Sequence, residues 1–197
     1  MGKSLEQRVT ELEKLVKQMQ ENKAVKISKN LCVGDTFELV GMKWTILDIT
    51  NAGYKCLAEK LKDSEFDKKS SNWSTSDLRS YLNTEFYGNL AETVGEDNII
   101  PFERDLLSLD GQTEYGSCED KVSLLGLDEY RKYRALIPNA DYYWWLITPY
   151  STPCNGYEKS VTVVCPSGRI LRCNYYDCNC GVRPFCIFSS SIFESEE

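Results

Sequence analysis

The feature that most constrains the fold is a short apolar heptad at the N-terminus. Its seam consists of apolar side chains spaced alternately by four and three residues: Leu5, Val9, Leu12, Val16 and Met19. The next seam positions are lysines, so the pattern ends near Gln20. A helix this short is marginal alone, because nucleation is costly and only packing offsets it. We therefore expect an oligomerisation helix over residues 1–24, a linker over residues 25–30 and one domain over residues 31–190.

The seam and its flanks bear on the number of chains in the coiled coil. Valine at a positions with leucine at d positions favours dimers. Residues 8–13, however, resemble the Arg-hydrophobic-x-x-hydrophobic-Glu motif of parallel trimeric coiled coils, and Leu15 widens the apolar stripe. We expect a parallel homotrimer, with a dimer as the second choice. The alternative is an amphipathic helix that lies on its own domain.

Composition and charge exclude several classes of function. The 197 residues include 30 acidic and 23 basic side chains, and a net charge of −7 argues against nucleic-acid binding. Without histidine, a Ser-His-Asp triad, a histidine-containing zinc site and an imidazole general base are impossible. No apolar stretch is long enough to cross a bilayer, and the N-terminus has no signal-peptide core. We expect no membrane insertion and no cofactor.

The first half of the domain predicts a meander followed by a helix. Residues 31–60 form short apolar–polar alternations separated by turn residues, which indicates a small antiparallel meander with Trp44 in its core. A helix is expected after Trp73, with Ser74 or Thr75 as its N-cap.

The second half predicts one helix and more short strands. Residues 96–110 are loop-like, and a helix is expected to start at Asp128 or Glu129. Trp144 and Trp145 are neighbours in an expected strand, so one should lie in the core and the other should be half-buried; the alternative is an aromatic binding platform. The other strand candidates form a hairpin and a closing strand: residues 161–164, 170–171 and 182–188.

The cysteines are unevenly distributed. Six of the nine lie in the last 44 residues: Cys154, Cys165, Cys173, Cys178, Cys180 and Cys186. Reduced thiols are the default for a chain without a signal peptide. The last four could form a zinc site or a disulfide, but their spacing lacks the usual two-residue knuckle. A catalytic cysteine would have no histidine base. We expect no metal site and no enzyme activity.

Six sequence motifs follow one another along the chain: GDTF at 34–37, WTIL at 44–47, the segment 73–87, DKVSLL at 120–125, WWLITP at 144–149 and GVRP at 181–184. Their order resembles the DUF6273 family of gut-bacterial and phage proteins. The resemblance extends from Cys32 to Phe188, with Ile147 and Thr148 in place of the usual Arg-Ser. It implies a C-type-lectin-like α+β domain of mixed short antiparallel strands and about two helices.

Such domains resemble the variable proteins of diversity-generating retroelements, in which a reverse transcriptase mutates adenines in a template copy. Mutated asparagine codons then encode residues such as Tyr, Cys, Asp, Ser, Arg, Leu and Asn, but never Lys, Glu, Gln, Met or Trp. Residues 171–180 contain only residues that this process supplies, and they precede the expected fixed element at 181–184. The resemblance implies a variable region at about residues 150–180. It also implies a location on a phage tail or a bacterial surface.

The expected binding face lies in this variable region, because Tyr, Asn, Ser and Arg combine rigid contact area with adaptable hydrogen bonds. Its candidate ligand-binding residues are Tyr150, Asn155, Tyr157, Arg169, Arg172, Asn174, Tyr175, Tyr176, Asp177 and Asn179, with Tyr175 and Tyr176 as anchors. Structural roles are expected for Trp44, Trp73, Asp77, Arg79, Trp144, Trp145 and Arg183.

The expected function is binding of an unknown protein or surface glycan, by an adhesin or a phage receptor-binding protein. One alternative is a fixed structural component of a phage or a cell surface. The other is a thiol- or zinc-dependent enzyme. Arg183 is expected to pair with a carboxylate or with strand carbonyls beneath the face. Residues 191–197 are expected to form a polar tail.

Overall fold

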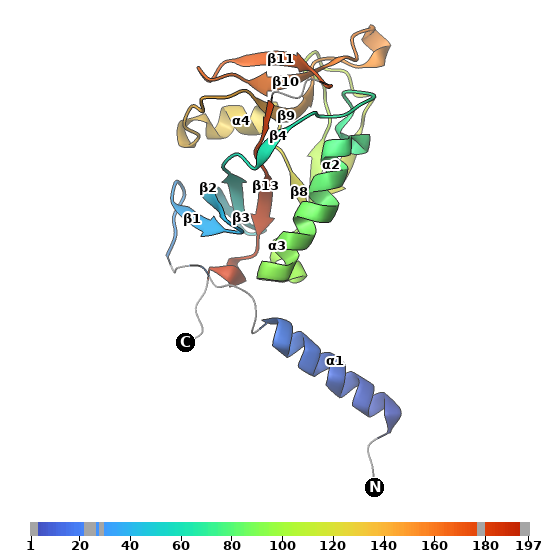
Figure 1. Ribbon diagram of the computed structural model, residues 1–197, viewed down its shortest axis with the longest axis vertical. Coiled ribbons are helices and arrows are strands. Elements are labelled where there is room, and N and C mark those ends of the chain that lie inside the picture. Colours follow the sequence, from blue (N-terminus) through green and yellow to red (C-terminus); the bar gives the residue numbers. More distant parts are fainter. Residues whose placement is uncertain (1–3, 22–26, 28–29, 177–179, 194–197) are drawn as a thin grey trace.

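Helix α1 (Leu5–Glu21) lies outside the domain (Figure 1). The computed structural model describes residues 4–21, 27, 30–176 and 180–193, and it leaves out the side chains of residues 15–21. The seam side chains Leu5, Val9 and Leu12 are 77%, 46% and 61% exposed, so the domain does not cover them. The side chains of Val16 and Met19 lie outside the described set. Residues 5–14 of α1, whose side chains the structure describes, therefore do not pack on the domain.

The first sheet contains the predicted meander. Its three strands are antiparallel neighbours, and Trp44 is fully buried between them and the rest of the core. A Cβ on Gly53 would overlap the carbonyl oxygen of Phe188, so only glycine fits this turn. In order across the sheet, the strands are β1 (Thr36–Leu39), β2 (Met42–Thr50), β3 (Gly53–Ala58), β13 (Phe185–Phe188) and β5 (Ile99–Ile100), and β8 (Val122–Ser123) also pairs with β13.

The second sheet forms the end of the domain farthest from α1 (Figure 1). Its central strands β9 and β12 are parallel, and the other pairs are antiparallel. The predicted hairpin is confirmed as β10 and β11, and β11 is the edge strand. In order, the strands are β11 (Ile170–Asn174), β10 (Ser160–Val164), β9 (Trp144–Pro149), β12 (Cys180–Val182) and β4 (Lys62–Ser64).

Two strand predictions are corrected. Residues 96–110 are not simply a loop, because they include β5 and also β6 (Phe102–Asp105), which pairs with β7 (Ser117–Asp120). The expected closing strand at 182–188 is divided, with β12 in the second sheet and β13 in the first. Pro184 lies at the crossing, where its missing N–H would interrupt a continuous ladder.

The helical segment near Trp73 begins differently from the prediction. Residues Trp73–Thr75 form a 3-10 turn, and the cap of α2 (Asp77–Tyr81) is Ser76. The Ser76 hydroxyl oxygen accepts a hydrogen bond from the Arg79 amide at 3.1 Å. A π-helical segment (Leu82–Phe86) and α3 (Tyr87–Val94) continue the rod.

Helix α4 (Leu127–Tyr133) starts one residue before the predicted range. Its Glu129 carboxylate accepts a hydrogen bond from the Gly126 amide at 2.8 Å, which stabilises the first turn. Within the described residues, no helix combines the length and the apolar character needed to span a bilayer.

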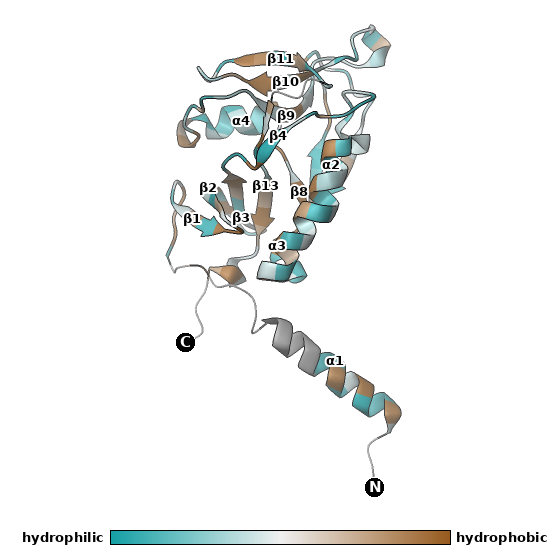
Figure 2. Ribbon diagram, viewed as in Figure 1, coloured by the Kyte–Doolittle hydropathy of each residue, from teal (hydrophilic) through white to brown (hydrophobic). Residues whose placement is uncertain are grey.

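Trp144 and Trp145 are both fully buried, which corrects the expectation of one half-buried side chain. The second sheet is covered on both faces: Trp145 packs against Phe66 and Trp144 against Tyr130, each with ring centroids 5.5 Å apart. The ribbon is correspondingly apolar along β9, β10 and β13, whereas α4 is largely polar (Figure 2). Neither tryptophan belongs to a binding platform.

The C-terminal segment is not a polar tail throughout. Ile192 and Phe193 are buried, and the Phe193 ring stacks on Tyr54 with centroids 4.1 Å apart. The Ile27 amide, in the expected linker, donates a hydrogen bond to the Ile192 carbonyl at 2.8 Å. The domain boundary therefore includes residue 27 at one end and residue 193 at the other. The fold as a whole is α+β with several antiparallel sheets.

Candidate ligand-binding surface

The expected structural residues Trp73 and Arg79 meet at a buried carboxylate, Asp120. Its two oxygens accept hydrogen bonds from Arg79 Nε at 2.5 Å and from Trp73 Nε1 at 2.7 Å. Burial by itself would lower the pKa of the Arg79 guanidinium. The hydrogen bond and the charge of Asp120 outweigh burial, so the pKa lies above its usual value. Asp77 lies in the first turn of α2, and its amide donates to the Asp67 carboxylate at 3.2 Å. These contacts join the helix to β7.

Arg183 lies between β12 and β13 and is buried. Its Nε donates a hydrogen bond to the Ala58 carbonyl at 3.0 Å, and its guanidinium lies 5.0 Å from the centre of the Trp144 ring. Burial lowers the pKa of this side chain. The sequence leaves two kinds of partner open for Arg183, a carboxylate or a strand carbonyl. In the structure, the partner is the carbonyl of Ala58 in β3.

Three of the candidate residues form a cluster, which we call the tyrosine–arginine cluster: Tyr150, Tyr157 and Arg172. The Arg172 guanidinium lies 4.7 Å from the Tyr150 ring centre and 5.0 Å from that of Tyr157. The two rings are 5.9 Å apart. Arg172 projects from the edge strand β11, and Tyr157 projects from the loop before β10. Cation–π contacts at exposed sites contribute about 0.5–1 kcal/mol each and favour the conformation in which the guanidinium lies near the rings.

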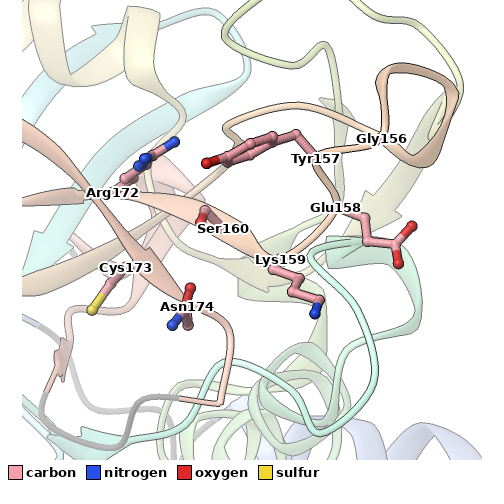
Figure 3. A pocket seen from close by; sticks show the side chains of 8 residues that line it. All are labelled: Gly156, Tyr157, Glu158, Lys159, Ser160, Arg172, Cys173 and Asn174. Atoms are coloured by element: carbon pink, nitrogen blue, oxygen red, sulfur yellow. The ribbon is translucent and has the colours of Figure 1, made fainter.

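The cluster borders a cleft of about 520 Å³ between this loop and β11. Figure 3 shows Tyr157 and Arg172 on one side of the strands, Lys159 and Asn174 on the other, and Glu158 pointing outward. The lining residues are Gly156, Tyr157, Glu158, Lys159, Ser160, Arg172, Cys173 and Asn174. The sequence prediction included Tyr157, Arg172 and Asn174 but missed the remaining five.

The two expected anchors, Tyr175 and Tyr176, have different environments. Tyr176 is 52% exposed, and its hydroxyl oxygen accepts a hydrogen bond from Asn174 Nδ2 at 3.3 Å. Tyr175 is half-buried and packs on the core, and its carbonyl accepts hydrogen bonds from the amides of Phe66 and Asp67. Of the two, only Tyr176 has a side chain that is largely exposed at the surface. Asp177 and Asn179 lie outside the described residues.

Asn155 is engaged in a hydrogen bond within the chain. Its amide donates to the Asp110 carboxylate at 2.9 Å, and the same carboxylate accepts from the Ser151 hydroxyl at 2.7 Å and the Ser108 hydroxyl at 2.5 Å. The hydrogen bonds from Ser108, Ser151 and Asn155 lower the pKa of Asp110 to about 2. Glu114 accepts from the Cys154 amide at 3.1 Å. The sequence carried no signal for these two carboxylates, because they bond to residues 40 and 45 positions away in the chain.

Arg169 lies away from the cleft. It belongs to the turn between β10 and β11, at the opposite end of β11 from Asn174, and its Nε donates to the Ser167 hydroxyl at 3.1 Å. Ser167 also contacts the Cys165 thiol at 3.1 Å, and this hydrogen bond lowers the pKa of Cys165 to about 7.

The clustered cysteines are dispersed in the fold. Cys186 lies opposite Cys56 in the β3–β13 ladder, and burial raises the pKa of both thiols well above the usual value. Cys180 pairs with Ser64 in the other sheet, and Cys178 lies outside the described residues. Across the described part of the chain, no group of three or more potential ligands is placed to hold a metal ion.

The fold and this surface define an α+β domain with an exposed, polar cleft at the edge of its second sheet. Residues 106–190 match the family model of DUF6273, a domain of unknown function, which supports assigning that domain to this part of the chain. The match contains the cleft, and the first three sequence motifs lie before it. No curated protein and no solved structure matches the chain.

Proposed function

We propose that this chain is a non-enzymatic ligand-binding protein with a C-type-lectin-like domain. In this proposal, a retroelement diversifies its surface over about residues 150–180, as in an adhesin or a phage receptor-binding protein. Its ligand is a protein or a surface glycan.

The observation that carries this proposal is the division between exposed and buried residues within that region. All five residues of β10 are buried, whereas residues 153–159 are exposed. On β11 and just after it, Arg172, Asn174 and Tyr176 are exposed. Exposed positions tolerate substitution at little cost in stability, whereas core positions do not. The exposed residues of this region can therefore change in sequence at little cost in stability, whereas the buried residues of β10 beneath them cannot.

The adjacent DNA provides the test. We expect a near-copy of the segment that encodes residues 150–180, with mismatches only at adenines. The mismatched codons should fall among residues 153–159 and 169–176, and codons 161–164 should match, because their side chains are buried. Mismatches at all four bases, mismatches in codons 161–164 as often as elsewhere, or no copy at all would favour a fixed structural component instead.

The exposed seam of α1 supports a second part of the proposal, a parallel homotrimer with a dimer as the second choice. Joining three copies multiplies weak contacts at the cleft into avidity without new chemistry. Light scattering on the full chain should give the trimer mass. A Leu12→Asp variant should give monomers with an unchanged domain unfolding temperature, because the domain does not cover this side chain. A monomeric wild-type chain would contradict the trimer.

A further inference from the structure

Strand β11 leaves one edge of the second sheet open. It is the outermost strand of that sheet (Figure 1), and β10 is its one partner among the described strands. Its five residues pair with β10 in an unbroken register, whereas the strand at the other edge, β4, has three residues. A regular, exposed edge strand is a template on which a further strand can pair.

The hydrogen bonds of the hairpin show which backbone groups of β11 are already used. In an antiparallel ladder, every second residue exchanges hydrogen bonds with the neighbouring strand. Just before β11, the Arg169 carbonyl accepts from the Cys165 amide at 2.9 Å. Just after it, the Tyr175 amide donates to the Lys159 carbonyl at 3.2 Å. The bonds from β11 to β10 therefore fall at its odd-numbered residues.

The even-numbered residues of β11 point their backbone N–H and C=O groups away from β10. These residues are Ile170, Arg172 and Asn174. Within the part of the chain that the structure describes, their backbone groups form no hydrogen bond with another segment. Arg172 and Asn174 are exposed. The open edge thus presents three N–H donors and three carbonyl acceptors, in the spacing that a paired strand requires.

Arg172 gives this edge its charge, because it is the one charged side chain of β11. Among the described residues, which leave out 177–179, the ion pairs lie elsewhere. Acidic side chains lie near the loop before β10, but Asp110 and Glu114 accept hydrogen bonds from that loop, and Glu158 points outward (Figure 3). An acidic residue on an added strand, directly opposite Arg172, would supply the opposite charge.

Leu171 indicates which residues would flank that acidic residue. Its side chain is 39% exposed, and side chains alternate along a strand, so it lies on the opposite face of the sheet from Arg172. The two neighbours of the acidic residue on an added strand would lie on that same face. A β-branched side chain there would cover Leu171 as a cross-strand pair. The edge therefore fits an extended segment with an acidic residue between β-branched ones.

A second copy of β11 fits this edge less well. The register that uses all three outward residues would place two Arg172 side chains opposite each other, and like charges in that position are destabilising. We infer that β11 binds an extended, acidic segment of a partner protein as an added strand, with Arg172 opposite its acidic residue. The inference rests on the proposed ligand-binding function and names the ligand as a protein segment.

This mode of binding suits a strand whose side chains vary. Main-chain hydrogen bonds supply affinity, and the side chains of an edge strand select the partner. The outward N–H and C=O groups of β11 stay the same when most residues at 170, 172 and 174 are exchanged. A diversified edge strand would therefore keep its affinity for extended segments and change the segment that it prefers.

A pair of N-methylated peptides tests the backbone contact. The probe is acetyl-Thr-Thr-Val-Glu-Val-Thr-Thr-amide, titrated into the full chain by calorimetry or NMR, with an expected Kd on the order of 0.1–1 mM. N-methylation of the glutamate should weaken binding at least about tenfold, because its N–H faces β11 when it lies opposite Arg172. The same methyl group on the valine before the glutamate points to the far edge and should change the Kd less than about twofold. Equal losses would contradict strand addition.

Amide hydrogen exchange on the protein gives a second readout. With the probe bound, exchange should slow at residues 170, 172 and 174, whose N–H groups gain acceptors. The amides of residues 171 and 173 already donate to β10 and should change little. A ligand held by side chains alone would not produce this alternation.

Two variants of Asn174 separate its backbone from its side chain. Asn174→Pro removes an outward N–H but no hydrogen bond to β10, and proline is tolerated at such edge positions. It should weaken binding of the probe at least about fivefold more than Asn174→Ala, which keeps the N–H. If Asn174→Pro does not fold, the N-methylated peptides make the same distinction on the wild-type chain.

An exchange of charges locates the acidic residue of the ligand. Arg172→Glu should weaken binding of the probe about fivefold, and it should bind the peptide with lysine in place of glutamate more tightly than the wild type does. Arg169→Glu is the control, because it makes the same change of charge in the turn outside β11. It should alter the Kd less than about twofold.

Several results would overturn the inference. These are no binding of the probe, protection of the odd-numbered amides instead of the even-numbered ones, or equal losses from Arg169→Glu and Arg172→Glu. Dimers of the Leu12→Asp variant that disappear when Asn174→Pro is added would assign the edge to a second copy of the chain. None of these results depends on the DNA copy, so failure of strand addition and failure of the diversification proposal are separately visible.

Discussion

Arginines occur in two settings in this domain, and the difference separates its framework from the proposed binding surface. Arg79, Arg104 and Arg183 are framework arginines, because each is fixed by oxygens of its own chain. Arg172, in contrast, is oriented by two aromatic rings and bonds no carboxylate among the described residues. An arginine whose N–H groups bond to oxygens of its own chain therefore stabilises the fold. An arginine such as Arg172, which bonds no carboxylate among the described residues, is the kind that we propose for ligand binding. The predictions below test where the boundary between framework and surface lies.

The largest effect is expected at Arg104, which is 4% exposed and forms a two-pronged pair with Glu129, at 2.8 and 2.6 Å. Arg104→Met should lower the free energy of unfolding by about 3 kcal/mol, because it leaves a largely buried carboxylate without its partner. Urea denaturation measures this change. The double variant Arg104→Met with Glu129→Met should recover part of the loss, since no charge is then stranded.

Arg172→Met is the matched control for that experiment. Its side chain is exposed, so the free energy of unfolding should change by less than about 0.5 kcal/mol. If Arg172→Met cost as much as Arg104→Met, the cluster around Arg172 would be part of the framework and the comparison would fail.

The neighbours Tyr175 and Tyr176 sharpen the boundary to a single residue. Tyr175→Ala should lower the free energy of unfolding by about 2 kcal/mol, because its half-buried ring packs on the core. Tyr176→Ala should change it by less than about 0.5 kcal/mol. Thermal or urea unfolding of the two variants measures both changes in the free energy of unfolding. Equal losses would place Tyr176 in the framework as well.

Much of the framework could be predicted because its signals are local. Turn glycines and period-two alternation gave β1–β3 and the β10–β11 hairpin. The burial of Trp145 could not be predicted, because strand alternation alone does not reveal that both faces of the second sheet are covered. Likewise, nothing local indicated that 182–188 would divide between two sheets.

For the candidate surface, residue type predicted Tyr157 and Arg172, and the structure places both at the cleft. Residue type did not indicate that Asn155 bonds to Asp110 or that Tyr175 packs on the core. Lys159 was not among the predicted residues, because lysine is not a product of the proposed codon mutagenesis. In the structure, it lines the cleft. Such contacts depend on residues distant in sequence, and one sequence does not contain that information.

Apart from the two control variants, the smallest loss is expected at Asp110, which links the framework to the exposed loop. Its carboxylate is bonded to Ser151 and Asn155, and so holds the loop that carries Tyr157. Asp110→Asn should lower the free energy of unfolding by about 1 kcal/mol, reduced from a buried value because the residue is exposed. Amide hydrogen exchange should increase mainly at residues 154–157.

The pH dependence of that loss identifies the carboxylate as its cause. The folded-state pKa of Asp110, about 2, lies below the ordinary value of 3.8. A lowered pKa means that the unfolded chain binds the proton more tightly, so the contribution to stability is complete above about pH 4.5 and disappears as the pH falls through about 2. The difference in stability between wild type and Asp110→Asn should therefore shrink over this window and be constant from pH 5 to pH 8. A difference that persisted at pH 2 would show that the loop is held by shape rather than by the charge, and the link between framework and surface would lie elsewhere.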